Sequence, residues 1–352
     1  MITYIPFLKF KTGEVNAISE LDPVVHRSIC PFFDFPKKGD ISADEFRDSV
    51  GKIDRAIAKH MPGVAELYFD NYDISDDLTI AGEQNYSYLL RKLAKWPIVP
   101  VVGVDRAKPR IAAVAKLKDD GVIRSGHIAL RVTTEEFESY VAIQDEITDL
   151  EPLFALFESI DLVFDLRIYD GADPEKLSRS ILSFSKKFCG KYKVRRVVVT
   201  GSSIPSSIGN VLKVKTECLL DRAELAVFEK VAAKHDHAHL VFGDYATVSP
   251  DYAEVTLPPE MMQNVMTPKF TYTLKGRHFF IRGERIRGNY EQYFEMARKL
   301  CAKGFYRGKA FSWGDAYLNS KSLELGGNCT PASVIKPTVN AHISYMASVL
   351  PF

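Results

Sequence analysis

Charged and hydroxyl-bearing residues follow a series of short apolar runs along the chain, and their chemical types suit binding or catalysis. They are Lys9, Asp34, Asp70, Asp105, Arg131, Asp165, Arg167, Ser202, Ser203 and Asp244. Carboxylates and cations on one face of a protein can bind a divalent metal, hold a phosphate or form an acid–base pair. The alternative is an interlocked set of salt bridges in which the charges neutralise one another.

Three of the carboxylates, Asp34, Asp165 and Asp244, are the catalytic candidates, because carboxyl groups supply acid–base or metal-ligand oxygens. Asp165 and Arg167 stand two apart, so on a strand their side chains share a face, where they can clamp a ligand or form an internal ion pair. The ligand-binding candidates are Lys9, Asp70, Arg131, Arg167, Gly201, Ser202, Ser203, Tyr245, Trp313 and Asp315. Such a set admits a divalent metal as cofactor, although the spacing assigns no metal ligands.

The segment Thr200-Gly-Ser-Ser-Ile-Pro205 is the sharpest local signal for an anion site. Gly201 lets backbone N–H groups approach an anion, and the two following hydroxyls add donors. The segment equally fits a hydroxyl-rich turn whose serine caps the next element. Neither serine lies in a G-x-S-x-G elbow, which argues against a serine nucleophile.

Two other clusters have simpler interpretations. The histidines of 235–239 fall between a predicted helix and the next strand, and we expect them to be exposed loop residues. A basic and aromatic cluster comprises Arg277, Phe279, Phe280, Arg282, Arg285 and Arg287. It can contact nucleic acid, or it can be the solvated edge of a hairpin.

The elements that position these residues repeat. Eight apolar runs end in charged or small polar residues, at 4–9, 29–35, 65–70, 98–104, 127–132, 161–167, 195–200 and 239–245. Helical patterns separate them, such as an apolar face over 43–60 that begins at a capping box of Ser42 and Glu45. This repetition predicts a (β/α)8 TIM-like barrel over residues 1–250, with its functional groups at the C-terminal ends of the strands. The rival, a doubly wound open sheet, lacks support from any G-x-G-x-x-G turn.

Beyond residue 250 the pattern changes, and we expect a C-terminal α+β appendage over 251–352, packed on the barrel. It contains a predicted hairpin at 270–282 and a predicted helix at 290–303. A helix is also expected over 217–234, and a short helix or strand over 339–345.

Bulk properties exclude several classes of protein. The net charge of +1 gives no field that would steer the chain toward nucleic acid or an anionic membrane. No apolar run approaches the roughly 18 residues of a membrane span. The N-terminus does not have the form of a signal peptide, and the five cysteines are far apart, so we expect a cytoplasmic protein.

Several segments resemble the phage and bacterial "beta protein" family. They are Pro6-Phe-Leu-Lys-Phe-Lys-Thr-Gly-Glu14, Gly201-Ser-Ser-Ile-Pro205, Phe242-Gly-Asp-Tyr245, Ser312-Trp-Gly-Asp315, Gly327-Asn-Cys-Thr-Pro-Ala-Ser333 and Asn340-Ala-His-Ile343. They occur in order over nearly the whole chain. A common ending of the family has Trp after the Thr and a His-His pair, where this chain has Pro331 and Ala341-His342. The resemblance implies a setting in bacteriophages or bacterial antiviral defence and assigns no activity.

The leading hypothesis is a barrel protein that binds a phosphate-bearing small molecule, with a nucleotide as the first candidate, at the C-terminal face of the barrel. If it is an enzyme, we expect a hydrolase or a phosphodiesterase-like activity. A second hypothesis is a non-catalytic protein-binding function, as an inhibitor or a defence-system subunit, through the appendage. Nucleic-acid binding through 277–287 is the third.

Overall fold

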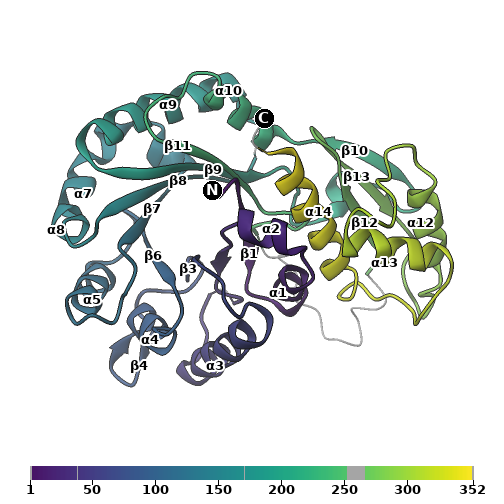
Figure 1. Cartoon of the computed structure of the whole chain (residues 1–352), viewed down its shortest axis with the longest axis horizontal. Coiled ribbons are helices and arrows are strands. Elements are labelled where there is room, and N and C mark those ends of the chain that lie inside the picture. The colour runs from purple at the N-terminus through teal and green to yellow at the C-terminus, as the bar shows by residue number, and fades with distance from the viewer. Residues whose placement is uncertain (1, 38, 170, 252–265, 351–352) are drawn as a thin grey trace.

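Eight parallel strands close into a barrel in the computed structural model, which describes residues 2–37, 39–169, 171–251 and 266–350 (Figure 1). The strands are β1 (Tyr4–Lys9), β2 (Phe32–Asp34), β3 (Leu67–Asp70), β6 (Ile98–Val102), β7 (His127–Thr133), β8 (Ser159–Ile168), β9 (Val194–Ser202) and β11 (His239–Asp244). Each pairs with its neighbour in the chain, and β11 closes the barrel against β1. The predicted (β/α)8 barrel is confirmed, and the open sheet is excluded.

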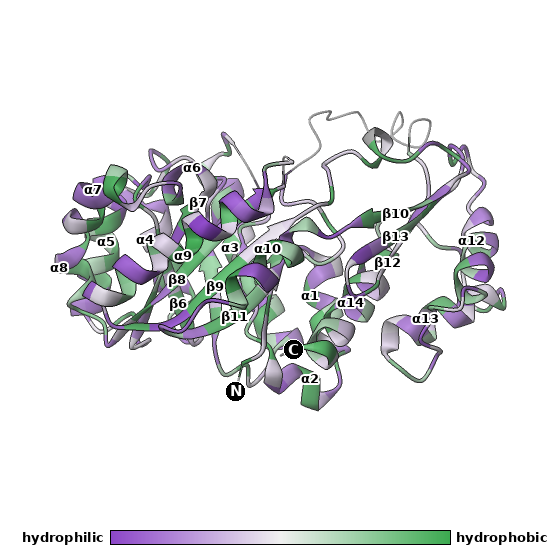
Figure 2. Cartoon of the chain, turned by 90° about the horizontal axis from the view of Figure 1, so that it is seen from above, coloured by the Kyte–Doolittle hydropathy of each residue, from purple (hydrophilic) through white to green (hydrophobic). Residues whose placement is uncertain are grey.

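The strands are apolar because both of their faces are buried, the inner one against other strands and the outer one against helices. Figure 2 shows these green strands at the centre of the barrel. The inward side chains include Phe7, Phe32, Tyr68, Val101, Ala129, Val163, Val198 and Val241, which form one cluster. Pro100 lies inside β6 as expected, opposite Phe69 of β3.

Helices cover the outside of the barrel. They are α1 (Thr12–Ser19), α2 (Pro23–Ser28), α3 (Ala43–His60), α4 (Asn85–Lys92), α5 (Lys108–Asp119), α6 (Thr134–Phe137), α7 (Gln144–Asp149), α8 (Glu151–Phe154), α9 (Pro174–Lys191) and α10 (Ala223–Ala232). A small ladder of β4 (Thr79–Ile80) and β5 (Glu83–Gln84) precedes α4. Short 3-10 turns lie at Tyr140–Ile143 and Ile208–Asn210. The predicted capping box of Ser42 and Glu45 is present at the start of α3.

The appendage is built on a three-stranded sheet of order β10-β13-β12. Strands β12 (Lys269–Thr273) and β13 (Arg277–Arg282) form the predicted hairpin. The third strand, β10 (Glu217–Asp221), comes from the connection between β9 and α10 and pairs antiparallel with β13. The prediction of a helix over 217–234 is therefore wrong for residues 217–221. Their local pattern favours a helix, but pairing with a hairpin distant in sequence holds them in an extended conformation. The sheet therefore contains one strand from before residue 250 and two strands from after it.

Three helices complete the appendage: α12 (Gln292–Cys301), α13 (Trp313–Ser322) and α14 (Ile335–Val349). Helix α14 packs against α1, α2 and β1 on one side and against β12 and α13 on the other, so it lies between the barrel and the appendage sheet (Figure 1). No helix in the described ranges is long and apolar enough to cross a membrane.

Candidate functional site

A buried guanidinium occupies the interior of the barrel at the C-terminal ends of the strands. Arg131 of β7 donates to Asp165 of β8 at 2.6 Å, to Asp34 of β2 at 2.7 Å and to Asp70 of β3 at 2.9 Å. It also donates to the hydroxyl of Tyr245 at 2.9 Å, and Tyr245 donates to Asp165 at 2.6 Å. Five of the predicted site residues therefore meet in one network.

Further arginines surround this network. Arg110 donates to Asp70 at 2.7 Å, and an Nη atom of Arg106 lies 3.3 Å from the same carboxylate. Burial alone would raise the pKa of Asp70, but the surrounding guanidinium groups hold it well below its usual range. The ring of Tyr72 lies 4.5 Å from the Arg131 guanidinium and 4.7 Å from that of Arg106. The carboxylates are thus neutralised within the protein.

The opposite end of the barrel carries a comparable network. Arg195 donates to Asp161 at 2.9 Å and to Glu66 at 2.7 Å, and Tyr68 donates to Asp161 at 2.6 Å. Active sites of such barrels lie at the C-terminal face, so a charged network at the other end is expected to stabilise the fold. This similarity favours the salt-bridge interpretation of the Arg131 network.

Arg167 follows Asp165 across an irregular turn of β8. Its φ of 51° lies in the left-handed region, and its backbone N–H donates to the Asp165 carboxylate at 2.8 Å. Its side chain pairs with Asp251 at 3.0 Å, and it lies 3.8 Å from Asp73 and 3.9 Å from Asp34. Arg167 therefore links the buried network to the loop after β11.

The serine loop after β9 uses its polar groups internally. Ser203 donates to Glu224 of α10 at 2.6 Å and accepts from the N–H of Ala223 at 2.9 Å, so it caps α10. The hydroxyl of Ser202 accepts from the N–H of Ile204 at 3.1 Å. A Cβ on Gly201 would lie 2.8 Å from the Leu166 Cβ, so this glycine allows close packing. A carboxylate against Ser203 repels an anion, and these contacts favour the capping turn.

Asp244 lies apart from Asp34 and Asp165. Its side chain points out of the barrel and accepts from Tyr4 and Arg222 at 2.5 Å each, while His342 Nε2 lies 2.8 Å away. The other ring nitrogen of His342 contacts the Thr273 hydroxyl at 2.7 Å. Asp244 thus joins β11 to α14 and β12, where all these groups are buried.

Trp313 and Asp315 are also distant from the Arg131 network, on α13 of the appendage. Asp315 is buried and accepts from the hydroxyls of Tyr272 and Ser312 at 2.5 Å each. The Trp313 ring stacks on that of Tyr317 with their centroids 5.7 Å apart, and the Lys336 ammonium lies 4.3 Å from the Trp313 ring centroid. Their predicted ligand-binding roles, like the catalytic roles of Asp34, Asp165 and Asp244, stay predictions.

A pocket of about 470 Å³ lies at the C-terminal face of the barrel, against the appendage. Its walls come from the loop after β1, the loops after β9 and β11, and residues of β12 and α14. Three lysines line it, Lys9, Lys11 and Lys269, together with Glu14, Asp251 and the hydroxyl residues Thr12, Ser206, Thr247 and Ser249. The first turn of α1 also contributes, through Thr12, Gly13 and Glu14. Cations and a helix N-terminus make this pocket suited to an anion.

Two groups of this pocket have unusual pKa values. Glu14 is 3% exposed, and burial raises its pKa from 4.5 to about 8, against the opposing effect of Lys11 and Lys9. Its Oε2 has no hydrogen-bond partner within the described part of the chain. Burial and the neighbouring Lys11 lower the pKa of Lys9 from 10.5 to about 8. Titratable groups in a pocket whose pKa values are shifted toward physiological pH are typical of functional sites.

Of this pocket, the sequence predicted only Lys9. Lys11 and Glu14 directly follow the first strand, and the rule that marks Lys9 also applies to them. Lys269 had no such signal, because it lies on a strand of the appendage.

In the Arg131 network, the sequence prediction missed Tyr72 and Arg106 as site residues. They follow β3 and β6, so their positions after strands could have identified them.

The remaining clusters offer no metal or stacking site in the described residues. No group of three or more histidine, cysteine or acidic residues there could hold a metal ion. The histidines at 235 and 237 lie in the loop between α10 and β11, at the end of the barrel opposite the pocket. Phe279 and Phe280 are 3% and 0% exposed, so their rings cannot stack on bases.

The sequence profile described as Beta protein matches residues 4–348. The chain belongs to this family. That match confirms the resemblance drawn from the short segments, and it covers the barrel and the appendage together. No curated protein matches the chain in sequence.

Solved structures similar to this chain include the apo form of 3-keto-D-glucoside 4-epimerase from E. coli. It is 9% identical, with 69% of this chain and 91% of that chain covered and a TM-score of 0.31. A fungal β-1,4-galactanase is 11% identical, with 70% and 78% covered and a TM-score of 0.32. The spore cortex-lytic enzyme SleL of Bacillus cereus is 9% identical, with 97% and 74% covered and a TM-score of 0.23.

Proposed function

We propose that this Beta protein family member binds a phosphate-bearing small molecule, with a nucleotide as the first candidate, in the pocket beside β1. The supporting observation is the combination of Lys9, Lys11 and Lys269 with the first turn of α1 around one cavity of about 470 Å³. Phosphate binds well at helix N-termini next to cations. The setting in bacteriophages or antiviral defence, implied by the family, is part of the proposal.

The geometry favours this pocket over the serine loop as the phosphate site. The hydroxyl of Ser203 donates to the carboxylate of Glu224, whereas three lysines line the pocket. Asp251, which also lines the pocket, already pairs with Arg167. Glu14, with a pKa of about 8, is mostly protonated at neutral pH and can donate a hydrogen bond to a phosphate oxygen.

Hydrolysis is the reaction that these groups would serve. Water would form the new bond to phosphorus while the bond to the leaving oxygen breaks. In the minority of molecules in which Lys9 is neutral, Lys11 and Lys269 would hold the phosphate, Lys9 would accept a proton from water, and Glu14 would give one to the leaving oxygen. Both pKa values, about 8, suit transfer near neutral pH.

The test of binding is thermal unfolding with inorganic phosphate, nucleoside monophosphates and nucleoside triphosphates, against sulfate and chloride at equal ionic strength. A ligand at a hundredfold excess over its dissociation constant stabilises the native state by about 2.7 kcal/mol. We expect Lys11→Ala to weaken the binding at least tenfold. Lys186→Ala, which removes an exposed lysine of α9 far from the pocket, should leave it unchanged.

Binding that persists in Lys11→Ala and in Lys9→Met would place the ligand elsewhere, and no stabilisation by any phosphate compound would refute the proposal. Hydrolysis is tested with a cyclic nucleotide, whose alkoxide leaving group requires a proton. Turnover that falls at least a hundredfold in Glu14→Gln, with binding retained, supports the role of Glu14 as the acid. Turnover equal to that of the parent chain would exclude it.

A further inference from the structure

Strand β10 forms an edge of the appendage sheet. In an antiparallel pair, alternate residues bond to the partner strand and the others point their backbone groups away from it. The N–H of Arg282 donates to Thr216 O at 3.0 Å and the N–H of Arg222 donates to Gly276 O at 2.9 Å, which fixes the phase. The residues that face β13 are therefore the even-numbered ones, and the backbone groups of Glu217, Leu219 and Asp221 face outward. No strand of the described residues pairs with this outer edge.

The side chains of the outward-facing residues lie on the α12 side of the sheet. Cys218 and Leu220, on the other side, pack on the cluster of Ile204, Leu212 and Phe280. Leu219 is 46% exposed, although it is flanked by a buried hairpin. An exposed leucine on a sheet edge that no described strand covers is a surface that can accept another strand.

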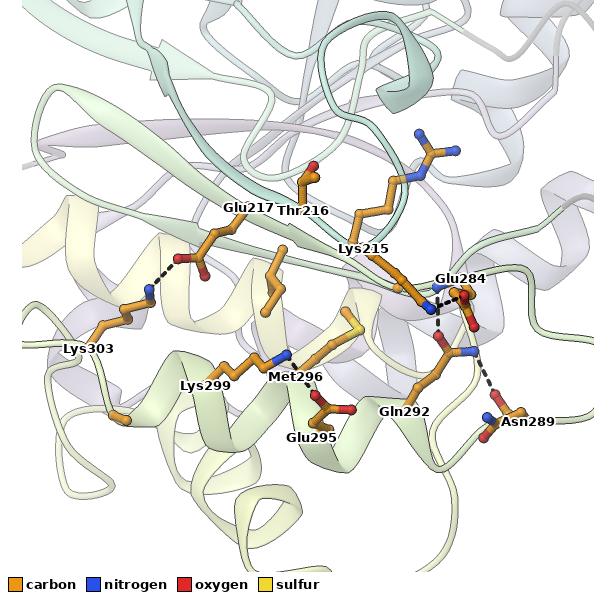
Figure 3. A pocket seen from close by; sticks show the side chains of 14 residues that line it. Lys215, Thr216, Glu217, Glu284, Asn289, Gln292, Glu295, Met296, Lys299 and Lys303 are labelled. Carbon is orange, nitrogen blue, oxygen red and sulfur yellow. Dashed lines mark hydrogen bonds and ion pairs between the residues drawn. The ribbon is translucent and has the colours of Figure 1, made fainter.

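A groove of about 900 Å³ begins at the same edge (Figure 3). The start of β10 and the end of β13 form one wall, and α12 forms the other, with Ile281 and Met296 as apolar lining residues. Ion pairs stand along its rim: Lys303 with Glu217, Lys299 with Glu295 and Lys215 with Glu284 (Figure 3). The groove thus offers apolar surface and charged groups beside backbone donors and acceptors that pair with no strand of the described residues.

We propose that β10 binds an extended segment of a partner protein as an added strand, with an apolar residue opposite Leu219 and a basic residue opposite Asp221. Strand addition to a sheet edge obtains affinity from backbone hydrogen bonds and specificity from alternate side chains. The carboxylate of Asp221 is 90% exposed, with the Arg277 guanidinium 4.0 Å away, and Glu217 already has Lys303 as partner. The charge requirement therefore falls mainly on the position opposite Asp221.

A second copy of this chain does not fit the edge. Antiparallel pairing of two β10 strands about Leu219 would set Glu217 of one copy opposite Asp221 of the other, and parallel pairing would also bring like charges together. Like charges directly opposite on neighbouring strands are destabilising.

The probe is a fluorescent peptide of sequence Thr-Lys-Thr-Val-Thr-Lys-Thr, which reads the same in both directions and so fits either strand orientation. Its control replaces both lysines by glutamate. We expect the basic peptide to bind the full chain at least tenfold more tightly than the acidic one, measured by fluorescence anisotropy. Amide hydrogen exchange at Glu217, Leu219 and Asp221 should slow in the complex.

Two variants test the edge. Leu219→Pro removes an outward N–H without removing a bond to β13, and should weaken binding at least tenfold. Asp221→Lys should reverse the preference between the two peptides, whereas Asp236→Lys, at a 79% exposed carboxylate far from the sheet, should not. The reversal in Asp221→Lys tests the proposal even if Leu219→Pro fails to fold.

Equal binding of the two peptides, or binding unchanged by Asp221→Lys, would overturn the proposal. A dimer in sedimentation experiments that Leu219→Pro dissociates would do the same, by making a second copy the occupant. Because the pocket beside β1 shares no residue with this edge, the result is independent of phosphate binding.

Discussion

Glu14 should make the stability of this protein depend on pH in a direction opposite to that of an ordinary paired carboxylate. Its pKa rises from 4.5 in the unfolded chain to about 8 in the folded one because of burial. Between these values the folded state binds more protons than the unfolded state, so stability falls as pH rises. The stabilisation is fully present below pH 4.5 and is lost as pH rises to about 8.

The magnitude follows from the shift. From pH 4.5 to pH 7 the unfolded chain releases a proton that the folded chain retains. At 1.36 kcal/mol per pH unit, about 2.5 units correspond to at most about 3 kcal/mol. Glu14→Gln keeps the shape of the neutral acid and cannot ionise. Its stability relative to the parent chain should therefore increase by up to about 3 kcal/mol between these two pH values.

The assay is urea unfolding of both chains at pH 4.5 and at pH 7, with the free energy of unfolding extrapolated to water. Glu146→Gln is the matched control, because Glu146 also lies in the first turn of a helix but is exposed. A difference between Glu14→Gln and the parent that is the same at both pH values would refute the reasoning. It would show that Glu14 is ionised in the fold.

Three further predictions concern stability, each measured by urea or thermal unfolding. Arg131→Met should lower the free energy of unfolding by about 3–5 kcal/mol, because three buried carboxylates lose their shared cation. A loss no larger than that caused by Arg179→Met, at an exposed position of α9, would contradict this. Gly314→Ala should lower the free energy of unfolding by about 1–3 kcal/mol, because its Cβ would clash with backbone atoms of Pro337 and Ala341 in α14. Gly190→Ala, which has open space around it, should be neutral or stabilising. Burial lowers the pKa of His342 below 6.5, so its contribution to stability is present above pH 6.5 and is lost as pH falls through the folded value. His342→Gln should therefore flatten the acid side of the pH–stability curve, and an unchanged acid slope would contradict this assignment.

Local sequence was sufficient for the elements that carry their own signals. The strands of the barrel are short apolar runs because both faces are buried, and α3 begins at Ser42 because that side chain caps the first turn. Asp173 caps α9, with Pro174 in the first position, for the same local reason. These features, repeated along the chain, determined the barrel and the face where its polar groups gather.

Tertiary structure decided which residues meet. A strand that is apolar on both faces has no alternation to fix its phase, so sequence could not tell that Asp165 points inward and Asp244 outward. Strand β10 was missed for a different reason, because its extended form comes from pairing with β13, about sixty residues later in the chain. The pocket beside β1 also depends on the position of the appendage, since Lys269 reaches it only after β12 packs beside α14. Local pattern therefore specifies elements, whereas side-chain phase and long-range packing specify the site.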